Sequence, residues 1–313
     1  MKPFCLTRRI SIAVVCLFLS ASFVLHTQET GFVPSHGVKT FYRTFGGAKG
    51  LPILIINGGP GMNSSGFAAV AQKLSEGGAY RTIIYDQRGT GKSVLATVDT
   101  STITMQLMVE DIEALRKHFG FERWTVLGHS FGGVLGAYYA TLHPERIDKL
   151  IFSSSGGINL DFLNYVGARI SGRLTQRERD SLAYWSERIS GGDTSHHARL
   201  QRGLALAPAY VFDRKYIPAI AERLTQGNAA INGLVFENLR AIRFDCTEHL
   251  RHFQRPTLII QGKDDIIKVE TAEYAHKILP NSRLVLLEKC AHYGWLDKEA
   301  EYFAAVRQFL RGE

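Results

Sequence analysis

The sequence of 313 residues lacks the features that mark several large classes of protein. Its four cysteines are too few and too scattered for a disulfide scaffold or a zinc cluster. No run of lysine and arginine exceeds two residues, which argues against a nucleic-acid-binding surface. There is no internal repeat or low-complexity tract. With 45% hydrophobic and 21% charged residues, the chain has the composition of a globular protein with a large core.

The net charge is small once the first residues are set aside. The formal charge is +8, from 37 basic and 29 acidic residues. Removing Lys2, Arg8 and Arg9 leaves 34 basic residues, a surplus of five over the 29 acidic ones. A surplus of this size gives no reason to expect a polyanionic partner.

The longest apolar stretch, Ile10 to Leu25, directly follows the basic pair Arg8-Arg9. A basic start, an apolar centre and a polar exit are the pattern of a signal peptide. The stretch has 16 residues, fewer than the roughly 20 that a spanning helix needs. We therefore expect residues 1–26 to be a signal peptide and the protein to be periplasmic or extracellular. An uncleaved membrane anchor and a buried N-terminal helix are the alternatives.

Two cysteines, Cys246 and Cys290, remain outside this leader. In an oxidising compartment they could form a disulfide bond. Two free, buried thiols are the other interpretation. The sequence leaves both open.

Beyond the leader, short β-rich apolar runs alternate with helical stretches, the pattern of a parallel sheet covered by helices. Six runs are predicted as strands: Ile53–Ile56, Thr82–Tyr85, Thr125–Leu127, Leu150–Ser153, Thr257–Gln261 and Leu284–Leu287. Val38–Phe45 predicts an antiparallel entry strand or hairpin. Four stretches show helical apolar spacing: Ser101–Phe119, Gly132–Leu142, Glu270–Ile278 and Glu299–Arg311. The chain is therefore expected to be of the α/β class.

One long segment interrupts this alternation. Residues 156–250 contain no convincing strand but have helical stretches at Gln176–Ile189, Ile217–Thr225 and Ile231–Ile242. An insertion after the C-terminal end of a strand lies where ligands bind in open α/β sheets. We expect a helical cap at 156–250 over a core of residues 35–155 and 251–313. A second structural layer without a substrate role is the alternative.

The candidate nucleophile is Ser130, in the sequence Gly128-His129-Ser130-Phe131-Gly132-Gly133. This G-x-S-x-G follows a predicted strand and opens a predicted helix. The turn between them must be tight, which requires small residues at Gly128 and Gly132 and strained backbone angles at the serine. The context therefore favours a nucleophile elbow over a structural glycine turn.

A serine nucleophile needs a histidine base held by a carboxylate, in the chain order Ser, Asp, His. The predicted strand Thr257–Gln261 leads to Asp264 and Asp265. Asp265 is the preferred acid, and Asp264 is the alternative. His292 follows the last predicted strand and is the candidate general base.

Hydrolysis also needs N–H donors for the developing oxyanion. The strand Ile53–Ile56 leads into the glycine-rich turn Asn57–Gly61, whose backbone can approach the serine. The predicted donors are the N–H of Phe131 and that of Gly59, with Gly58 as the alternative to Gly59.

Two further patterns do not carry their usual function. Gly91-Lys92-Ser93 ends like a phosphate-binding loop, but Asp86 stands where that motif needs its first glycine. His196-His197 and His249-x-x-His252 lack the other ligands of a metal site. We expect neither a metal nor another cofactor.

Together these motifs resemble the α/β-hydrolase superfamily, and within it the proline iminopeptidase family. The resemblance rests on Asn57–Gly61, the run from Asp86 to Ser93, the serine elbow, and the late Asp265 and His292, and it covers about residues 35–155 and 250–313. It implies an eight-stranded, mostly parallel sheet, with the Asp86 run as structural support. The family usually has histidine where this chain has Asn57.

The resemblance implies a serine aminopeptidase that releases N-terminal proline or a small residue. In that family, cap glutamates hold the free amino group of the substrate, and Glu237 is the nearest candidate here, ahead of Glu222 and Glu187. The alternative is that Glu237 is a solvated helix residue paired with Arg240 or Arg243. An esterase or lactonase acting on small acyl substrates is the alternative, and a non-catalytic binding module is a remote one. The expected partner is a small peptide or acyl substrate.

Overall fold

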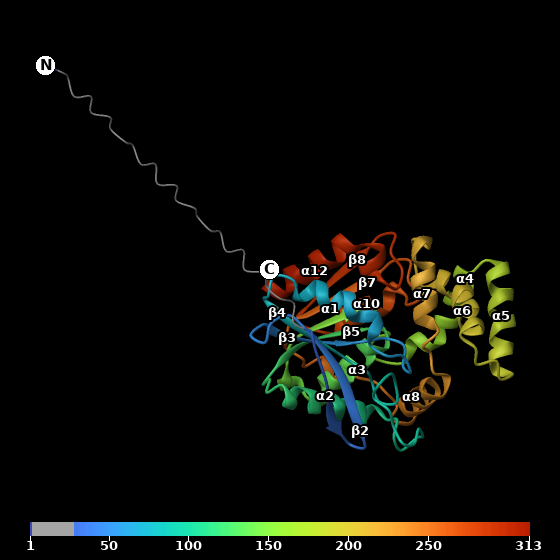
Figure 1. The fold of residues 1–313 in the computed structure, drawn as a ribbon, viewed down its shortest axis with the longest axis horizontal. Helices are drawn as coiled ribbons and strands as arrows, with labels where there is room; N and C mark the ends of the chain where they lie inside the picture. The colour runs from blue at the N-terminus through green and yellow to red at the C-terminus, as the bar shows by residue number, and fades with distance from the viewer. Residues whose placement is uncertain (2–27) are drawn as a thin grey trace.

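The computed structural model describes Met1 and residues 28–313 (Figure 1). The predicted leader, with Cys5 and Cys16, lies outside the described residues. None of the helices in residues 28–313 combines the length and hydrophobicity of a membrane span.

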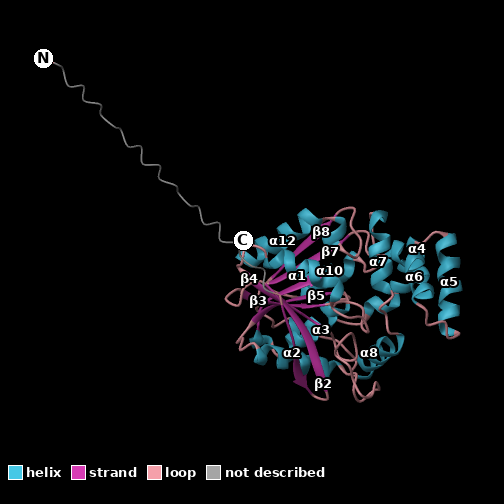
Figure 2. Ribbon diagram, in the orientation of Figure 1, coloured by secondary structure: helices cyan, strands magenta, loops and turns pink. Residues whose placement is uncertain are grey.

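A single sheet of eight strands forms the centre of the molecule (Figure 2). The strands are β1 (Glu29–Ser35), β2 (Val38–Phe45), β3 (Leu51–Ile56), β4 (Tyr80–Tyr85), β5 (Trp124–His129), β6 (Ile147–Ser153), β7 (Thr257–Gly262) and β8 (Ser282–Leu287). Their order is β1-β2-β4-β3-β5-β6-β7-β8. The β1–β2 hairpin is antiparallel and β2 also pairs antiparallel with β4, whereas all other pairs are parallel. The predicted eight-stranded, mostly parallel sheet is confirmed.

Helices cover both faces of the sheet because alternate strand residues point to opposite sides. On β3, Leu54 and Ile56 pack in the cluster that contains α2 (Met105–His118), α3 (Phe131–Leu142) and α10 (Val269–Ile278). Ile53 and Ile55 pack in the cluster with α1 (Ala68–Ser75) and α12 (Glu299–Arg311). In Figure 1, α12 lies toward the top of the view and α2 toward the bottom, beside β2. The inner part of β3 is thus buried on both faces of the sheet.

Several helices differ from the sequence prediction, and for α2 and α1 the reason is local. Helix α2 begins at Met105 and not at Ser101, because Thr104 is extended and its side chain accepts a hydrogen bond from the N–H of Leu107 at 3.1 Å. Helix α1 is not among the predicted helices. Its eight residues are only about two turns, too short for helical periodicity to stand out.

The described residues between β6 and β7 form helices and no strand. The helices are α4 (Val166–Arg173), α5 (Gln176–Ser190), α6 (His196–Leu206), α7 (Ile217–Leu224), α8 (Ala229–Ala241) and α9 (Thr247–Leu250). Figure 1 shows α4 to α7 as a group to one side of the sheet, with α8 below them. This helical insertion is the cap, and it follows the C-terminal end of β6.

Both cysteines of residues 28–313, Cys246 and Cys290, are free and buried. They do not form a disulfide bond with each other. The structure therefore agrees with the second interpretation of the sequence, two free and buried thiols.

Candidate active site

Ser130 lies at a sharp turn between β5 and α3. Its φ is +54° and its ψ is −119°, angles that a residue with a side chain seldom adopts. Hydrogen bonds hold this conformation: the Ser130 N–H donates to the carbonyl of Ser153 at 3.0 Å, and the Ser130 carbonyl accepts from the N–H groups of Gly133 at 3.0 Å and Gly156 at 3.1 Å. The strained backbone is therefore fixed by both neighbouring segments.

The glycines around Ser130 allow backbones to approach very closely. A Cβ atom on Gly128 would lie 2.3 Å from the carbonyl oxygen of Gly132, and one on Gly132 would lie 2.1 Å from that of Ile56. On the turn after β3, a Cβ atom on Gly58 would lie 2.6 Å from the Cβ of Ser130. These contacts explain the small residues and bring the glycine-rich turn beside the serine.

His292 and Asp265 are hydrogen-bonded to each other. His292 Nδ1 lies 2.8 Å from Asp265 Oδ1, and the two side chains are 2% and 0% exposed. The carboxylate also accepts bonds from Gln261 Nε2 at 2.8 Å and from the Ile267 N–H at 3.2 Å. Three donors thus hold one orientation of Asp265.

Asp264 is placed differently. It is only partly buried, and its backbone N–H donates to the carbonyl of Cys290 at 2.9 Å. Within residues 28–313 its carboxylate makes no hydrogen bond to His292. The structure therefore brings Asp265, and not Asp264, to the histidine.

Ser130 and His292 line the same cavity. Since Nδ1 of His292 faces Asp265, Nε2 is the ring nitrogen left for a substrate. The backbone N–H of His292 donates to the backbone carbonyl of Tyr210 in the cap at 3.0 Å. This bond connects the loop that carries His292 to the cap. The Ser130 hydroxyl is not hydrogen-bonded to His292 in the described chain. Such contacts are often long in free enzymes and shorten when substrate binds.

The predicted oxyanion donors Gly58, Gly59 and Phe131 line this cavity too. The buried Asn57 supports their turn, since its Nδ2 donates to the carbonyls of Gly58 at 3.2 Å and Met62 at 3.1 Å. The backbone of the turn and the start of α3 thus both lie next to the serine.

Asp86 supports the same region from beneath. Its carboxylate accepts bonds from the N–H of Ser64 at 2.9 Å, the Ser64 hydroxyl at 2.7 Å and the N–H of Lys92 at 2.9 Å. It does not line the cavity. This contact set agrees with a structural role for the Asp86 run.

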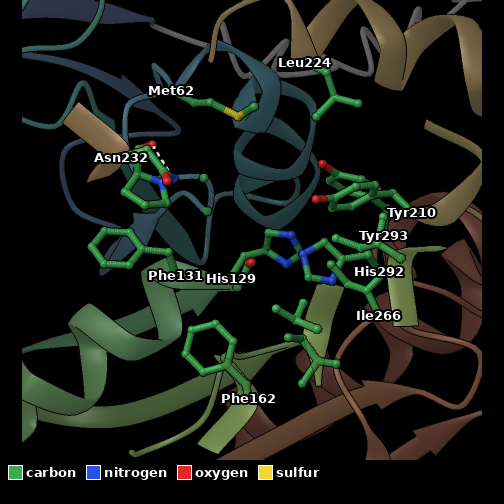
Figure 3. Close-up of a pocket in the computed structure, with 18 of the residues that line it drawn as sticks. Met62, His129, Phe131, Phe162, Tyr210, Leu224, Asn232, Ile266, His292 and Tyr293 are labelled. Atoms are coloured by element: carbon green, nitrogen blue, oxygen red, sulfur yellow. Dashed lines mark hydrogen bonds between the residues drawn. The ribbon is translucent and has the colours of Figure 1, made fainter. Parts of the chain in front are cut away.

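The cavity has a volume of about 250 Å³ and a mainly apolar wall (Figure 3). Its apolar side chains come from both the cap and the core: Met62, Phe131, Phe162, Leu163, Val166, Ile170, Leu224, Phe236, Ile266 and Ile267. Its polar side chains are Ser130, His129, His292, Tyr210, Tyr293, Asn232 and Arg223. Among the described residues, no aspartate or glutamate lines this cavity.

Glu237 does not lie in the cavity. Helix α8 buries Ile231, Val235 and Leu239 and turns Phe236 toward the cavity, whereas Glu237 is exposed. It stands two residues after Val235, about 200° around the helix from that buried stripe. This placement corrects the prediction of Glu237 as the ligand of a substrate amine.

The other two candidate acids are also exposed. Glu222 forms an ion pair with His196 at 3.0 Å, in which both side chains are more than half exposed. Glu187 lies on the outer surface of α5. Neither lines the cavity.

The sequence did not predict His129 and Arg223, which are among the residues that line the cavity. His129 is 1% exposed, and its ring centroid lies 4.7 Å from that of His292 and 4.7 Å from that of Trp295. Burial, and then electrostatic interactions with His292 and Arg223, hold the pKa of His129 well below its usual value. Arg223 is 6% exposed on α7. Its spacing from Ile220 and its position beside Leu224 put it on an apolar helix face, a signal visible in the sequence.

Within residues 28–313, no three His, Cys, Asp or Glu side chains are grouped as metal ligands would be. The polar side chains that line the cavity are the serine, the histidines, the tyrosines, the amide and the guanidinium named above.

Comparison with known proteins agrees with this geometry. The chain is 25% identical over 287 residues to a proline iminopeptidase of Lactobacillus helveticus, covering 90% of this chain and 97% of that one. Its structure resembles that of a proline iminopeptidase from Mycobacterium smegmatis, with a TM-score of 0.68, 23% identity, and coverage of 91% and 98%. It also resembles a 2-hydroxy-6-oxo-6-phenylhexa-2,4-dienoate hydrolase from Rhodococcus sp. strain RHA1, with a TM-score of 0.71, 21% identity, and coverage of 91% and 99%.

The family model of the alpha/beta hydrolase fold matches residues 52–299, from the start of β3 to the start of α12. This range contains the serine turn, the Asp265–His292 pair and the cap. The chain therefore belongs to the α/β-hydrolase family.

Proposed function

We propose that this protein is a serine hydrolase that cleaves an ester or amide through an acyl-enzyme, with Ser130 as nucleophile and His292 and Asp265 as its base and orienting acid. The observation that carries the proposal is the 2.8 Å bond between His292 Nδ1 and Asp265 Oδ1 at the wall of the cavity that holds Ser130. Asp265 fixes the tautomer of His292 in which Nε2 is free to accept a proton.

The reaction follows from these positions. His292 Nε2 takes the proton of the Ser130 hydroxyl as its oxygen attacks the carbonyl carbon of the substrate. The N–H groups of Phe131 and Gly59, with Gly58 as the alternative to Gly59, stabilise the oxyanion. His292 then protonates the leaving group, and a water molecule activated by His292 releases the acyl group from Ser130.

The character of the cavity supports an ester with a short acyl chain as the substrate. A volume of about 250 Å³ with apolar walls accommodates a short acyl chain. The cation Arg223 lines it, which disfavours a protonated substrate amine nearby. Ester hydrolysis is therefore the activity that the geometry supports best.

Release of N-terminal proline is the second candidate. It is favoured by the relatives, among them the proline iminopeptidase of Lactobacillus helveticus, aligned with 90% of this chain. An aminopeptidase must also offset the desolvation of a protonated α-amino group, for which a carboxylate is the usual partner. In residues 28–313 the cavity offers none.

One purified sample decides between the two candidates. We would measure kcat/KM for 4-nitrophenyl butyrate and for proline 4-nitroanilide, with Ser130→Ala as the control for both. We expect the ester to be hydrolysed and the anilide not. Turnover of the anilide that disappears in Ser130→Ala would establish the aminopeptidase instead.

We also propose that residues 1–26 direct export to the periplasm or the outside of the cell. The support is the order of basic, apolar and polar segments in the sequence. N-terminal sequencing of exported protein should find a start between Phe23 and Phe32. An intact Met1 in a membrane pellet would favour the anchor.

A further inference from the structure

Arg223 is a buried cation in the wall of the catalytic cavity. It lies in the last turn of α7 and is 6% exposed. Ile220 and Leu224, three residues before it and one after it, turn the same face of the helix inward. The cap thus carries a guanidinium into the space that also holds Ser130.

Few groups of the protein interact with the guanidinium of Arg223. The guanidinium carbon lies 5.0 Å from the centre of the Phe67 ring, and Nη2 donates to the carbonyl of Gly58 at 3.4 Å. Nε and Nη1 are buried and have no hydrogen-bond partner in the described chain. A buried charge without an ionic partner is costly, so an unmatched guanidinium at a binding site calls for an explanation.

The other buried arginines of residues 28–313 differ from Arg223 in this respect. Arg88 pairs with both oxygens of Asp111, at 2.8 and 2.9 Å. Arg116 pairs with both oxygens of Glu113, at 2.7 Å each. Both lie away from the cavity. Where this fold buries an arginine for structure, it supplies a carboxylate, and Arg223 has none.

The charge of Arg223 acts directly on the catalytic region. Its positive charge, and then a hydrogen bond from its side chain, lower the pKa of Tyr293, against the larger effect of burial, which raises it. Tyr293 and His292 are consecutive, and both line the cavity beside Ser130. An anion bound at Arg223 would therefore lie within the same small cavity as the bond to be cleaved.

We propose that the substrate carries a carboxylate and that Arg223 binds it while Ser130 attacks a neighbouring ester or amide. This inference rests on the proposed hydrolase function and adds the substrate class. The carboxylate belongs either to the acyl part or to the leaving group, since the cavity is shared by both. Arg223 is then a specificity residue whose unpaired charge is matched only when substrate is bound.

Two matched pairs of substrates test the proposal and locate the carboxylate. The first pair is the 4-nitrophenyl monoester of adipic acid and the same ester with the distal carboxylate replaced by a carboxamide. The second pair is the acetyl esters of 4-hydroxybenzoic acid and of 4-hydroxybenzamide. In the unmodified protein we expect kcat/KM to favour the carboxylate at least tenfold in one pair. The pair that shows the preference identifies the acyl part or the leaving group.

Arg223→Gln should reduce this preference at least tenfold, and Arg223→Lys should keep part of it, because the charge remains but the planar donor geometry is lost. The ratio within a pair cancels any general loss from a shifted Gly58 turn. Arg199→Gln, an exposed arginine on cap helix α6, is the matched control and should keep the ratio of the unmodified protein.

A binding measurement separates this proposal from the hydrolase proposal. In Ser130→Ala, which cannot form an acyl-enzyme, titration calorimetry should show that the carboxylate compound of the favoured pair binds at least tenfold more tightly than its carboxamide. Adding Arg223→Gln should remove the difference. No carboxylate preference in binding, or a preference that survives Arg223→Gln, would overturn the role of Arg223. Absent turnover with an intact binding preference would count against the hydrolase alone.

Discussion

Replacing Asp265 by asparagine should leave the protein folded but nearly inactive. The substitution changes one oxygen to an NH₂ group in a site where the carboxylate accepts three hydrogen bonds. If the amide oxygen stays toward His292, the new NH₂ faces Gln261 Nε2, a donor that now lies 2.8 Å from the carboxylate. If the amide turns over, its NH₂ faces His292 Nδ1 and selects the wrong tautomer, and it also faces the N–H of Ile267, a donor that now lies 3.2 Å from the same oxygen.

Gln261 cannot easily relieve this conflict by rotating its own amide. Its Nε2 also donates to the carbonyls of Gly262 at 3.2 Å and Ile267 at 3.1 Å, and both bonds would be lost. Because the contact with Gln261, at 2.8 Å, is shorter than the contact with the Ile267 N–H, at 3.2 Å, we expect the asparagine to turn over. It then stabilises the tautomer in which Nε2 carries a proton and cannot accept one. The corresponding change in a serine protease triad lowers kcat about 10⁴-fold, or about 5.4 kcal/mol of transition-state stabilisation.

The assay is steady-state hydrolysis of the best ester, with Asp264→Asn as the matched control. Asp264 is partly exposed and its carboxylate is not bonded to His292, so its replacement should change kcat by less than about threefold. KM should change little in either variant, because the lost interaction acts in the transition state. Similar losses in the two variants, or a loss expressed in KM, would refute the reasoning.

Three further predictions concern the buried groups and the cap. Burial holds the pKa of His129 well below 6.5, so below about pH 6.5 the unfolded chain binds a proton at this residue that the folded chain does not bind. The free energy of unfolding should therefore fall by up to about 1.4 kcal/mol for each pH unit below about 6.5. In urea unfolding of His129→Phe, the free energy of unfolding should fall less steeply with decreasing pH, by the contribution of His129. An unchanged dependence on pH would contradict the lowered pKa of His129. Burial raises the pKa of Cys246 to about 12 and also raises that of Cys290, so neither thiol should react with Ellman's reagent in the folded protein at pH 8; rapid reaction of either would count against their burial. Glu237→Gln should change kcat/KM less than twofold for ester and anilide alike, whereas a loss confined to the anilide would restore Glu237 as an amine ligand.

The sheet and the residues at its edge could be read from the sequence because local chemistry constrains them strongly. The spacing of Gly128 and Gly132 around Ser130 reflects backbone approaches that no side chain would permit. His292 and Asp265 were found because both follow a strand, and the carboxyl ends of parallel strands meet at one edge of the sheet. The choice of Asp265 over Asp264 was made on spacing alone, and the structure brings Asp265 to the histidine.

The cap residues could not be assigned in the same way. Which face of a cap helix meets the cavity depends on how that helix packs on the core, and one residue of rotation is about 100°. Glu237 was chosen for its charge, although Ile231, Val235 and Leu239 already marked a buried stripe on another face. Arg223 was overlooked because arginine on an apolar helix face is commonly expected to extend its charge into solvent. Only the packing of α7 shows that this guanidinium is buried.

The most direct test of the account is whether Ser130 is an activated nucleophile. The intact protein would be treated with a fluorophosphonate probe, digested and analysed by mass spectrometry, beside Ser130→Ala and the exposed control Arg199→Gln. The account predicts one phosphonylated serine, Ser130, in the unmodified protein and in Arg199→Gln, and neither labelling nor ester turnover in Ser130→Ala. A probe adduct on another residue with Ser130 unmodified, or turnover that survives Ser130→Ala, would contradict it.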